Sequence, residues 1–197
     1  MFGDIIKRDF YTRNSIEVAK DLLGKCIVRK VGANVICGKI VETEVYRGFD
    51  DTASHAHKGP TERCKVMFGE AGHAYIYLTY GIHNMLNLVT EDKYFPSAVL
   101  IRALEPVLGV NEGVDEKGRK VVVTNGPGKL AKTLKIDRSL NGIDLTIGKD
   151  LWVSEHKDYS NNFDIKSSER VGIDYAHEKD RKRLWRFFIK ENSYVSR

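Results

Sequence analysis

Apolar and polar residues alternate along much of this chain, the pattern of β-strands whose two faces meet different surroundings. The alternation predicts a first hairpin with strands at 26–30 and 35–46, and a second with strands at 74–80 and 85–90. Further strands are expected at 98–104, 151–153, 169–173 and 184–189. Successive hairpins of this kind favour a mainly antiparallel sheet.

Helical periodicity is confined to short segments. Asn14 followed by Glu17 resembles a capping box before an apolar stripe that ends at Gly24, and Gly126-Pro127 opens a second short helix. A helical turn is expected within 61–68. With no linker or internal repeat, residues 1–197 are predicted to form one α+β domain: a curved, mainly antiparallel sheet with surrounding short helices and a protruding hairpin.

The segment Ile40-Val41-Glu42-Thr43-Glu44-Val45-Tyr46 carries unusual chemistry on one face of its predicted strand. Alternation places the two acids and the tyrosine together, with their Cβ atoms about 7 Å apart along the strand. A solvated polar face would explain this pattern. If the face lines a cleft instead, burial and mutual repulsion would disfavour ionisation of both acids, and one could be tuned as a general base.

The second hairpin is rich in tyrosine. Tyr75 and Tyr77 share a strand face, and Tyr80 lies beside Gly81 at the predicted tip. Such residues usually pack across strands, but an exposed aromatic tip can also wedge between base pairs or stack on an unpaired base. Asn87 interrupts an apolar return strand, where it either satisfies backbone groups or contacts a ligand.

Arg102 lies within an otherwise apolar strand, and an unpaired buried guanidinium would cost several kcal/mol. An ion pair with Glu42, Glu44 or Glu105 would satisfy it. Alternatively, it could clamp a phosphate, or a water molecule held beside a catalytic carboxylate. The residues alone leave both readings open.

Composition indicates which kind of partner and which cellular compartment to expect. A net charge of +5 and an isoelectric point near 9.0 are compatible with a polyanionic partner. Three cysteines without close pairing, no signal peptide and no long apolar run predict a soluble intracellular protein with free thiols and no membrane association. Asp50, Asp51, His55 and His57 are close in sequence but lack a recognised metal-ligand spacing, so no metal is expected.

Several separated motifs resemble the alkyladenine (3-methyladenine) DNA glycosylases, in order from about residue 6 to the C-terminus. They are Val41 to Tyr46, His55, Gly72 to Gly81, Asn87, Arg102 to Pro106, Asn125 to Leu130 and Arg170 to Ile173. The resemblance implies that Glu44 is the general base activating a water molecule. It also implies that Arg102 and the carbonyl of Val171 complete the cradle of that water.

The resemblance further implies how damaged DNA is held. Tyr46 would stack on one face of a flipped-out base and His55 with Tyr77 on the other, while Asn87 would exclude the 2-amino group of guanine. Two more contacts follow for the DNA outside this pocket. Tyr80 would fill the gap left in the duplex, and Lys129 would contact the phosphate backbone.

The implied activity is hydrolysis of the N-glycosidic bond of damaged purines in double-stranded DNA, without metal or cofactor. The enzyme would be monomeric and would work in the cytoplasm, nucleoid or nucleus. Two alternatives stay open: a bifunctional glycosylase with a lysine nucleophile, and a non-catalytic damage-binding module. The segment 59–64 departs from the family pattern by losing an arginine and an asparagine, which bears on affinity or lesion preference.

Overall fold

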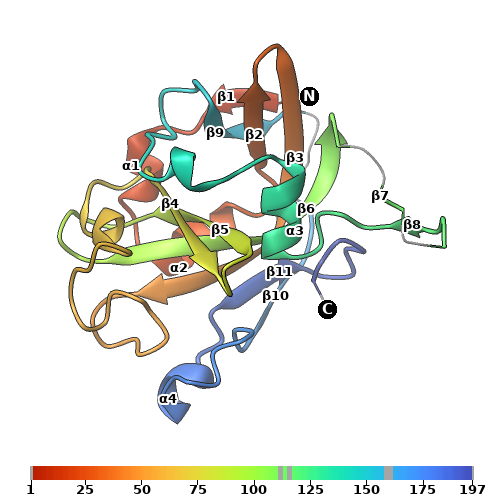
Figure 1. The fold of residues 1–197 in the computed structure, drawn as a ribbon. Helices are drawn as coiled ribbons and strands as arrows, with labels where there is room; N and C mark the ends of the chain where they lie inside the picture. Colours follow the sequence, from red (N-terminus) through yellow and green to blue (C-terminus); the bar gives the residue numbers. More distant parts are fainter. Residues whose placement is uncertain (1, 111–112, 115–116, 158–161, 197) are drawn as a thin grey trace.

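The computed structural model describes residues 2–110, 113–114, 117–157 and 162–196, and an antiparallel sheet dominates them (Figure 1). Its main path runs β1-β9-β2-β3-β6-β5-β4, and β11 joins β3 and carries β10. These strands are β1 (Phe2–Ile5), β2 (Cys26–Val31), β3 (Asn34–Arg47), β4 (Ala74–Thr79), β5 (His83–Val89), β6 (Ser97–Leu108), β9 (Leu151–His156), β10 (Ile165–Ser168) and β11 (Arg186–Ile189). A separate pair is formed by β7 (Gly113–Val114) and β8 (Lys120–Val121).

The helices are short and surround the sheet, which confirms the predicted α+β class (Figure 1). They are α1 (Arg8–Tyr11), α2 (Ser15–Asp21), α3 (Pro127–Thr133) and α4 (Glu178–Arg181), with 3₁₀ turns η1 (Lys65–Phe68) and η2 (Arg138–Leu140). The Asn14 side chain caps α2 by accepting from the Ile16 amide, and Pro127 opens α3 as predicted. Among the described residues, we find no helix with the length and apolar character needed to cross a membrane.

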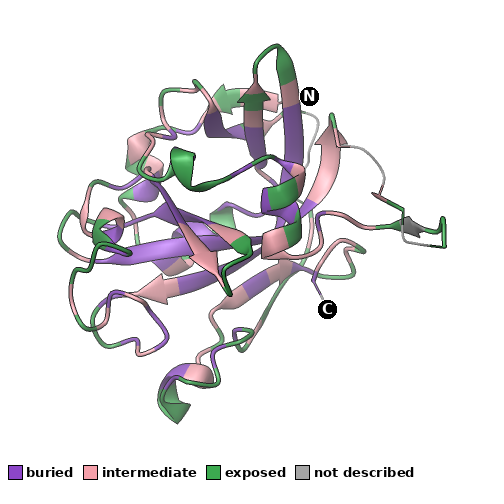
Figure 2. Ribbon diagram, viewed as in Figure 1, coloured by how far each residue is buried: buried purple, intermediate pink, exposed green. Residues whose placement is uncertain are grey.

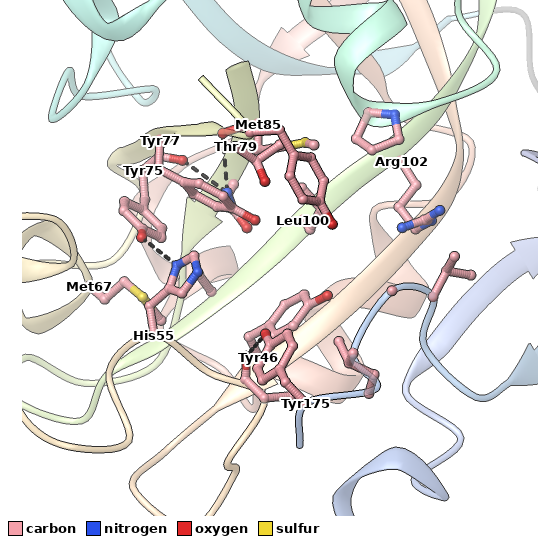
Figure 3. Close-up of a pocket in the computed structure, with 18 residues that line it drawn as sticks. Tyr46, His55, Met67, Tyr75, Tyr77, Thr79, Met85, Leu100, Arg102 and Tyr175 are labelled. Carbon is pink, nitrogen blue, oxygen red and sulfur yellow. Dashed lines mark hydrogen bonds between the residues drawn. The ribbon is translucent and has the colours of Figure 1, made fainter. Parts of the chain in front are cut away.

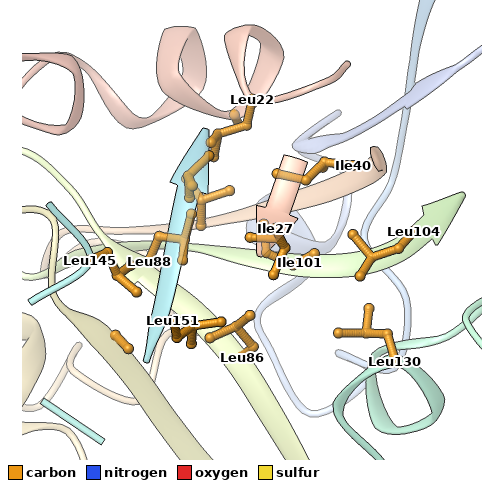
Figure 4. Close-up of a cluster of buried hydrophobic side chains, with 14 of the residues drawn as sticks. Leu22, Ile27, Ile40, Leu86, Leu88, Ile101, Leu104, Leu130, Leu145 and Leu151 are labelled. Atoms are coloured by element: carbon orange, nitrogen blue, oxygen red, sulfur yellow. The ribbon is translucent and has the colours of Figure 1, made fainter. Parts of the chain in front are cut away.

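The main core lies between one face of the sheet and the helices (Figure 4). Leu22 after α2, Leu130 of α3 and Ile101 of β6 are each fully buried in it. Figure 2 shows that burial is greatest in the middle of the long strands and lowest at the hairpin tips. All three cysteines are free thiols buried within the fold.

Strand β3 lies at the centre of the sheet, fourth of the seven strands along its main path, and it has neighbours along both edges. β6 runs along one edge, whereas β2 pairs with its first half and β11 with residues 42–44 on the other edge. The face predicted to be apolar is the core face: Val41 and Val45 join the main cluster, and Thr43 donates to the carbonyl of Ala19. The opposite face carries Glu42 and Glu44 into the protein, so it is not the solvated face of an exposed sheet.

The pairing between β3 and β6 is irregular near Glu42. The register between β3 and β6 shifts on both sides of Glu42, where Ile40 pairs with Leu104 and Thr43 with Ile101. Ladder irregularities of this kind bend a strand and redirect its side chains. Arg102 lies at the shift, between Ile101 and Ala103, and its side chain is on the acid-bearing face.

The prediction of a strand at 169–173 is wrong. β10 ends at Ser168, and the following residues form an irregular loop. Gly172 has a φ of 73°, in the left-handed region that favours glycine, and the Val171 amide donates to a side chain in place of a neighbouring strand. The other predicted strands and both hairpins are present.

We expect Leu104→Ala to lower the free energy of unfolding by about 2–5 kcal/mol, because it removes a fully buried side chain that also packs over Gly38. The matched control is Ile147→Ala, at a residue with 63% exposure, with an expected change within about 0.5 kcal/mol. Urea unfolding followed by circular dichroism measures both. Equal losses in the two variants would contradict this description of the core.

Candidate active site

Glu44 is a fully buried carboxylate held by three donors. The Val171 amide donates to Oε1 at 2.8 Å, while the Tyr46 hydroxyl at 2.9 Å and Arg102 Nη1 at 3.2 Å donate to Oε2. An ionised carboxylate offers about four lone-pair positions. The three bonds leave one position on Oε1 for a further donor such as a water molecule.

Glu42 is equally buried, but its bonds tie it to the protein scaffold. Arg102 Nε and Arg186 Nε donate to its Oε1 at 2.9 and 2.7 Å. Ser196 adds its amide to Oε2 at 2.6 Å and its hydroxyl to Oε1 at 2.8 Å. The structure thus distinguishes two acids that the alternation treats alike, since Glu42 meets β11 and the last described residues.

The buried charges perturb one another. Burial raises the pKa of Glu44 and the nearby Glu42 adds to this, against the lowering by Arg102, the Val171 amide and the Tyr46 hydroxyl. Burial alone would lower the pKa of Arg102, but the charges of Glu44 and Glu42 outweigh it and the pKa rises. Arg102 is therefore a permanent cation shared by two carboxylates, and Glu44 has the raised pKa of a candidate general base.

A cavity of about 430 Å³ opens beside Glu44. Figure 3 shows Tyr75, Tyr77 and His55 on one side of it and Tyr46 with Tyr175 on the other. Tyr46, Arg102 and Val171 line the cavity and also bond to Glu44, which itself does not line it. The carboxylate thus lies one hydrogen bond behind the cavity wall.

The aromatic side of the cavity is tightly arranged. The rings of His55 and Tyr77 meet edge to face with centroids 4.6 Å apart, and His55 Nδ1 lies 2.9 Å from the Tyr75 hydroxyl. Burial, with the charge of Arg63, lowers the pKa of His55 to about 4, and burial raises that of Tyr77 to about 12. Near neutral pH this wall therefore consists of uncharged rings.

Asn87 forms part of the same cavity and is 2% exposed. Its Nδ2 donates to the carbonyls of Tyr75 and Met85 at 3.1 and 3.2 Å. The side chain satisfies backbone groups, as one reading of its position expected, and it also lines the cavity, so contact with a ligand stays a prediction. These bonds fix the amide as a rigid wall.

Two residues expected to contact DNA are exposed near the cavity: Tyr80 lines its edge, whereas Lys129 does not line it. Tyr80 is 89% exposed at the tip of the β4–β5 hairpin, with φ values of 50° at Tyr80 and 72° at Gly81 that form a tight turn. Lys129 is exposed on α3, and its Nζ donates to Asn125 Oδ1 at 2.9 Å. Pro127 lines the cavity, which places the start of α3 at its edge.

An ion pair between Arg170 and Asp51 joins the two loops around the cavity. Arg170 donates to both carboxylate oxygens of Asp51 at 2.6 and 2.8 Å and to the Val45 carbonyl at 2.7 Å. Its guanidinium also lies 4.9 Å from the centre of the Tyr46 ring. The pair holds the loop of His55 against that of Val171, a role that the sequence reasoning missed.

The sequence reasoning also missed three residues in and around the site: Arg186, Ser196 and Tyr175. Arg186 offered the same signal as Arg102, a charge within an apolar strand that requires an anion, whereas Ser196 offered none. Tyr175 lines the cavity and donates to the Ala53 carbonyl at 2.9 Å.

Within the described ranges, no three His, Cys, Asp or Glu side chains are grouped to share a metal ion, and Asp51 is bound to Arg170.

The altered segment 59–64 packs against the aromatic residues of the cavity without lining it. Cys64 is buried, with its sulfur 3.1 Å from Thr61 Oγ1, and Arg63 places its guanidinium 4.9 Å from the centre of the Tyr77 ring. The segment therefore supports the aromatic wall from outside. Its departure from the family pattern bears on that wall and leaves the carboxylate cluster intact.

Comparisons with known proteins agree with the motifs. A sequence model of the methylpurine-DNA glycosylase (MPG) family matches residues 9–193. A relative from Methanocella arvoryzae is 46% identical over 196 residues, covering 98% of this chain and 96% of its own. One from Clostridium novyi is 44% identical over 98% of both chains, and both are named "Putative 3-methyladenine DNA glycosylase".

We expect the His55 imidazole to titrate with a midpoint near pH 4, because burial and the charge of Arg63 disfavour its protonation. Nuclear magnetic resonance of the histidine ring protons, assigned with His55→Gln, measures this midpoint. Arg63→Gln removes the nearby charge and should move the midpoint upward. A His55 midpoint at or above 6 would contradict the described environment.

Proposed function

Because this chain belongs to the methylpurine-DNA glycosylase family, we propose that it hydrolyses the N-glycosidic bond of damaged purines in double-stranded DNA and leaves an abasic site. The substrates would be 3-methyladenine and similar alkylated bases, with hypoxanthine and ethenoadenine as further candidates. The observation that carries the proposal is a buried, partly liganded carboxylate directly behind an aromatic cavity.

Base flipping gives the damaged purine access to this cavity. A stacked base is out of reach of an enzyme, and extrusion costs least where pairing or stacking is already weakened. Tyr46 would stack on one face of the extruded base, with His55 and Tyr77 on the other. Tyr80, exposed at the hairpin tip, would occupy the gap left in the duplex.

The cavity suits a positively charged base. A cationic purine gains about 0.5–2 kcal/mol from each well-placed aromatic face. The neutral state of His55 near pH 7 avoids repulsion of such a base. Asn87, fixed by two backbone carbonyls, would bar the additional 2-amino group of guanine.

The chemistry then needs one base and one placed water molecule. Oε1 of Glu44 would accept a proton from water as the glycosidic bond breaks, and the carboxylate would stabilise the positive charge that develops on the sugar. Arg102 and the Val171 carbonyl would hold the water beside Glu44. A cationic base leaves without prior protonation, so no acid is required for that class of lesion.

The enzyme would be a monofunctional, monomeric hydrolase without cofactor. Among the described residues that line the cavity there is no lysine, which favours a water nucleophile over a Schiff base. Lys129, exposed at the start of α3, would contact a backbone phosphate. Its place of work would be the cytoplasm, nucleoid or nucleus, where DNA is found.

We expect Glu44→Gln to slow release of 3-methyladenine from methylated duplex DNA by about 10²–10⁴-fold, because the amide cannot accept the proton of water. Chromatography of the released base gives the rate, and a gel-shift assay should still detect binding of damaged DNA. Glu178→Gln, at an exposed residue paired with Lys182, is the matched control and should retain full activity. Unchanged release by Glu44→Gln would rule out Glu44 as the base.

We expect Tyr80→Ala to slow base release from duplex DNA by about tenfold or more, because the wedge that replaces the extruded nucleotide is lost. Tyr80→Phe retains the ring and should behave like the wild type. A single strand has no gap to fill, so release from single-stranded DNA should change little in either variant. Equal effects on the two forms of DNA would contradict the wedge role.

A further inference from the structure

Four charged side chains form a closed group behind the candidate active site. Glu42 and Glu44 are fully buried, while the side chains of Arg102 and Arg186 are 8% and 15% exposed. When both acids are ionised, two negative and two positive charges balance inside the protein. Because such charges are costly to bury alone, the loss of any one changes the field on the other three.

The four charges are not equivalent, because Arg102 is shared. It donates to Glu42 at 2.9 Å and to Glu44 at 3.2 Å, whereas Arg186 bonds with Glu42 alone among these acids. Arg186 supplies the second positive charge that Glu42 requires. Arg102 is thereby able to serve as a counterion for Glu44 as well as for Glu42.

We propose that Glu42 and Arg186 act as a charge-balancing pair that sets the pH at which Glu44 becomes an active base, through the shared Arg102. The inference rests on the proposed role of Glu44. In this view, Glu42 and Arg186 are positioning residues that never touch the substrate. The alternative is a structural role, in which the pair only fastens β11 to β3.

Glu42 is the acid among the groups with the largest effects on the pKa of Glu44, and Asp51 is paired with Arg170, whose charge also interacts with Glu44. From β3 it faces Glu42 and Tyr46, and from β6 it faces Arg102. Arg170, Tyr77 and Tyr175 act on it more weakly from the surrounding loops and β4, and Arg186 lies opposite it in the strand register. Glu42 and Arg186 are thus the charges whose removal can be set against each other.

The direction of each effect follows from the sign of the charge removed. Glu42→Gln removes a negative charge and leaves Arg102 and Arg186 less compensated, so ionised Glu44 is favoured and its pKa falls. Arg186→Met removes a positive charge and leaves Glu42 competing for Arg102, so the pKa of Glu44 rises. The double variant removes one charge of each sign and should restore the wild-type pKa.

The experiment measures single-turnover release of 3-methyladenine from a methylated A·T duplex as a function of pH. We expect the acid limb of the profile to move down by about one pH unit in Glu42→Gln and up by about one unit in Arg186→Met. Arg186→Lys keeps the charge and should stay near the wild type. The double variant should return to the wild-type limb even if its maximal rate is lower.

Circular dichroism at each pH separates loss of folding from a change in titration. If Glu42→Gln does not fold, the contrast between Arg186→Met and Arg186→Lys decides the matter alone. An acid limb that stays fixed in folded variants, shifts alike in both single variants or is absent from the wild type would overturn the inference. No base release by the wild type at any pH would instead contradict the proposed function.

Discussion

The central constraint in this molecule is the burial of two carboxylates two residues apart on one strand. Glu42 and Glu44 have no exposed surface, and burial of one unpaired charge costs several kcal/mol. The structure meets that cost with Arg102 and Arg186, two backbone amides and two hydroxyl groups. Apart from Tyr46, which lies on the same strand, these partners come from β6, β11, the Val171 loop and Ser196 near the C-terminus, so the fold must bring distant segments together before the cluster exists.

Strand β3 makes this cluster possible because it has a neighbour along each edge. β6 brings Arg102 from one side, and β11 brings Arg186 from the other. The Arg170–Asp51 pair fixes the loops that close the cavity, and it places the Val171 amide on Glu44. The aromatic wall, by contrast, is built locally on the β4–β5 hairpin and the His55 loop.

The sequence predicted the parts of the fold that depend on local pattern. Alternation identified both hairpins and the two faces of the stretch from Val41 to Tyr46, and Asn14 with Pro127 marked helix starts. It failed at 169–173, where a strand was expected but Gly172 and long-range hydrogen bonds produce a loop. Local periodicity cannot reveal a segment whose partners lie more than a hundred residues away.

The residues of the site, like the fold, were only partly predictable from the sequence. A buried Arg102 required an anionic partner, which the sequence alone could predict. The resemblance to a known family supplied roles for Glu44, Tyr46 and His55. The residues alone gave no means of separating Glu44 from Glu42. That difference arises from Arg186 and Ser196, which approach Glu42 from the far end of the chain, and from the cavity that opens beside Glu44.

The most direct test of the account is a base-release assay with the unmodified protein on a panel of duplexes that each carry one defined lesion. Free base and strand breaks are measured together. We expect release of 3-methyladenine with an intact strand bearing an abasic site. Strand cleavage through a borohydride-trappable adduct, or binding to every duplex without release of any base, would contradict it.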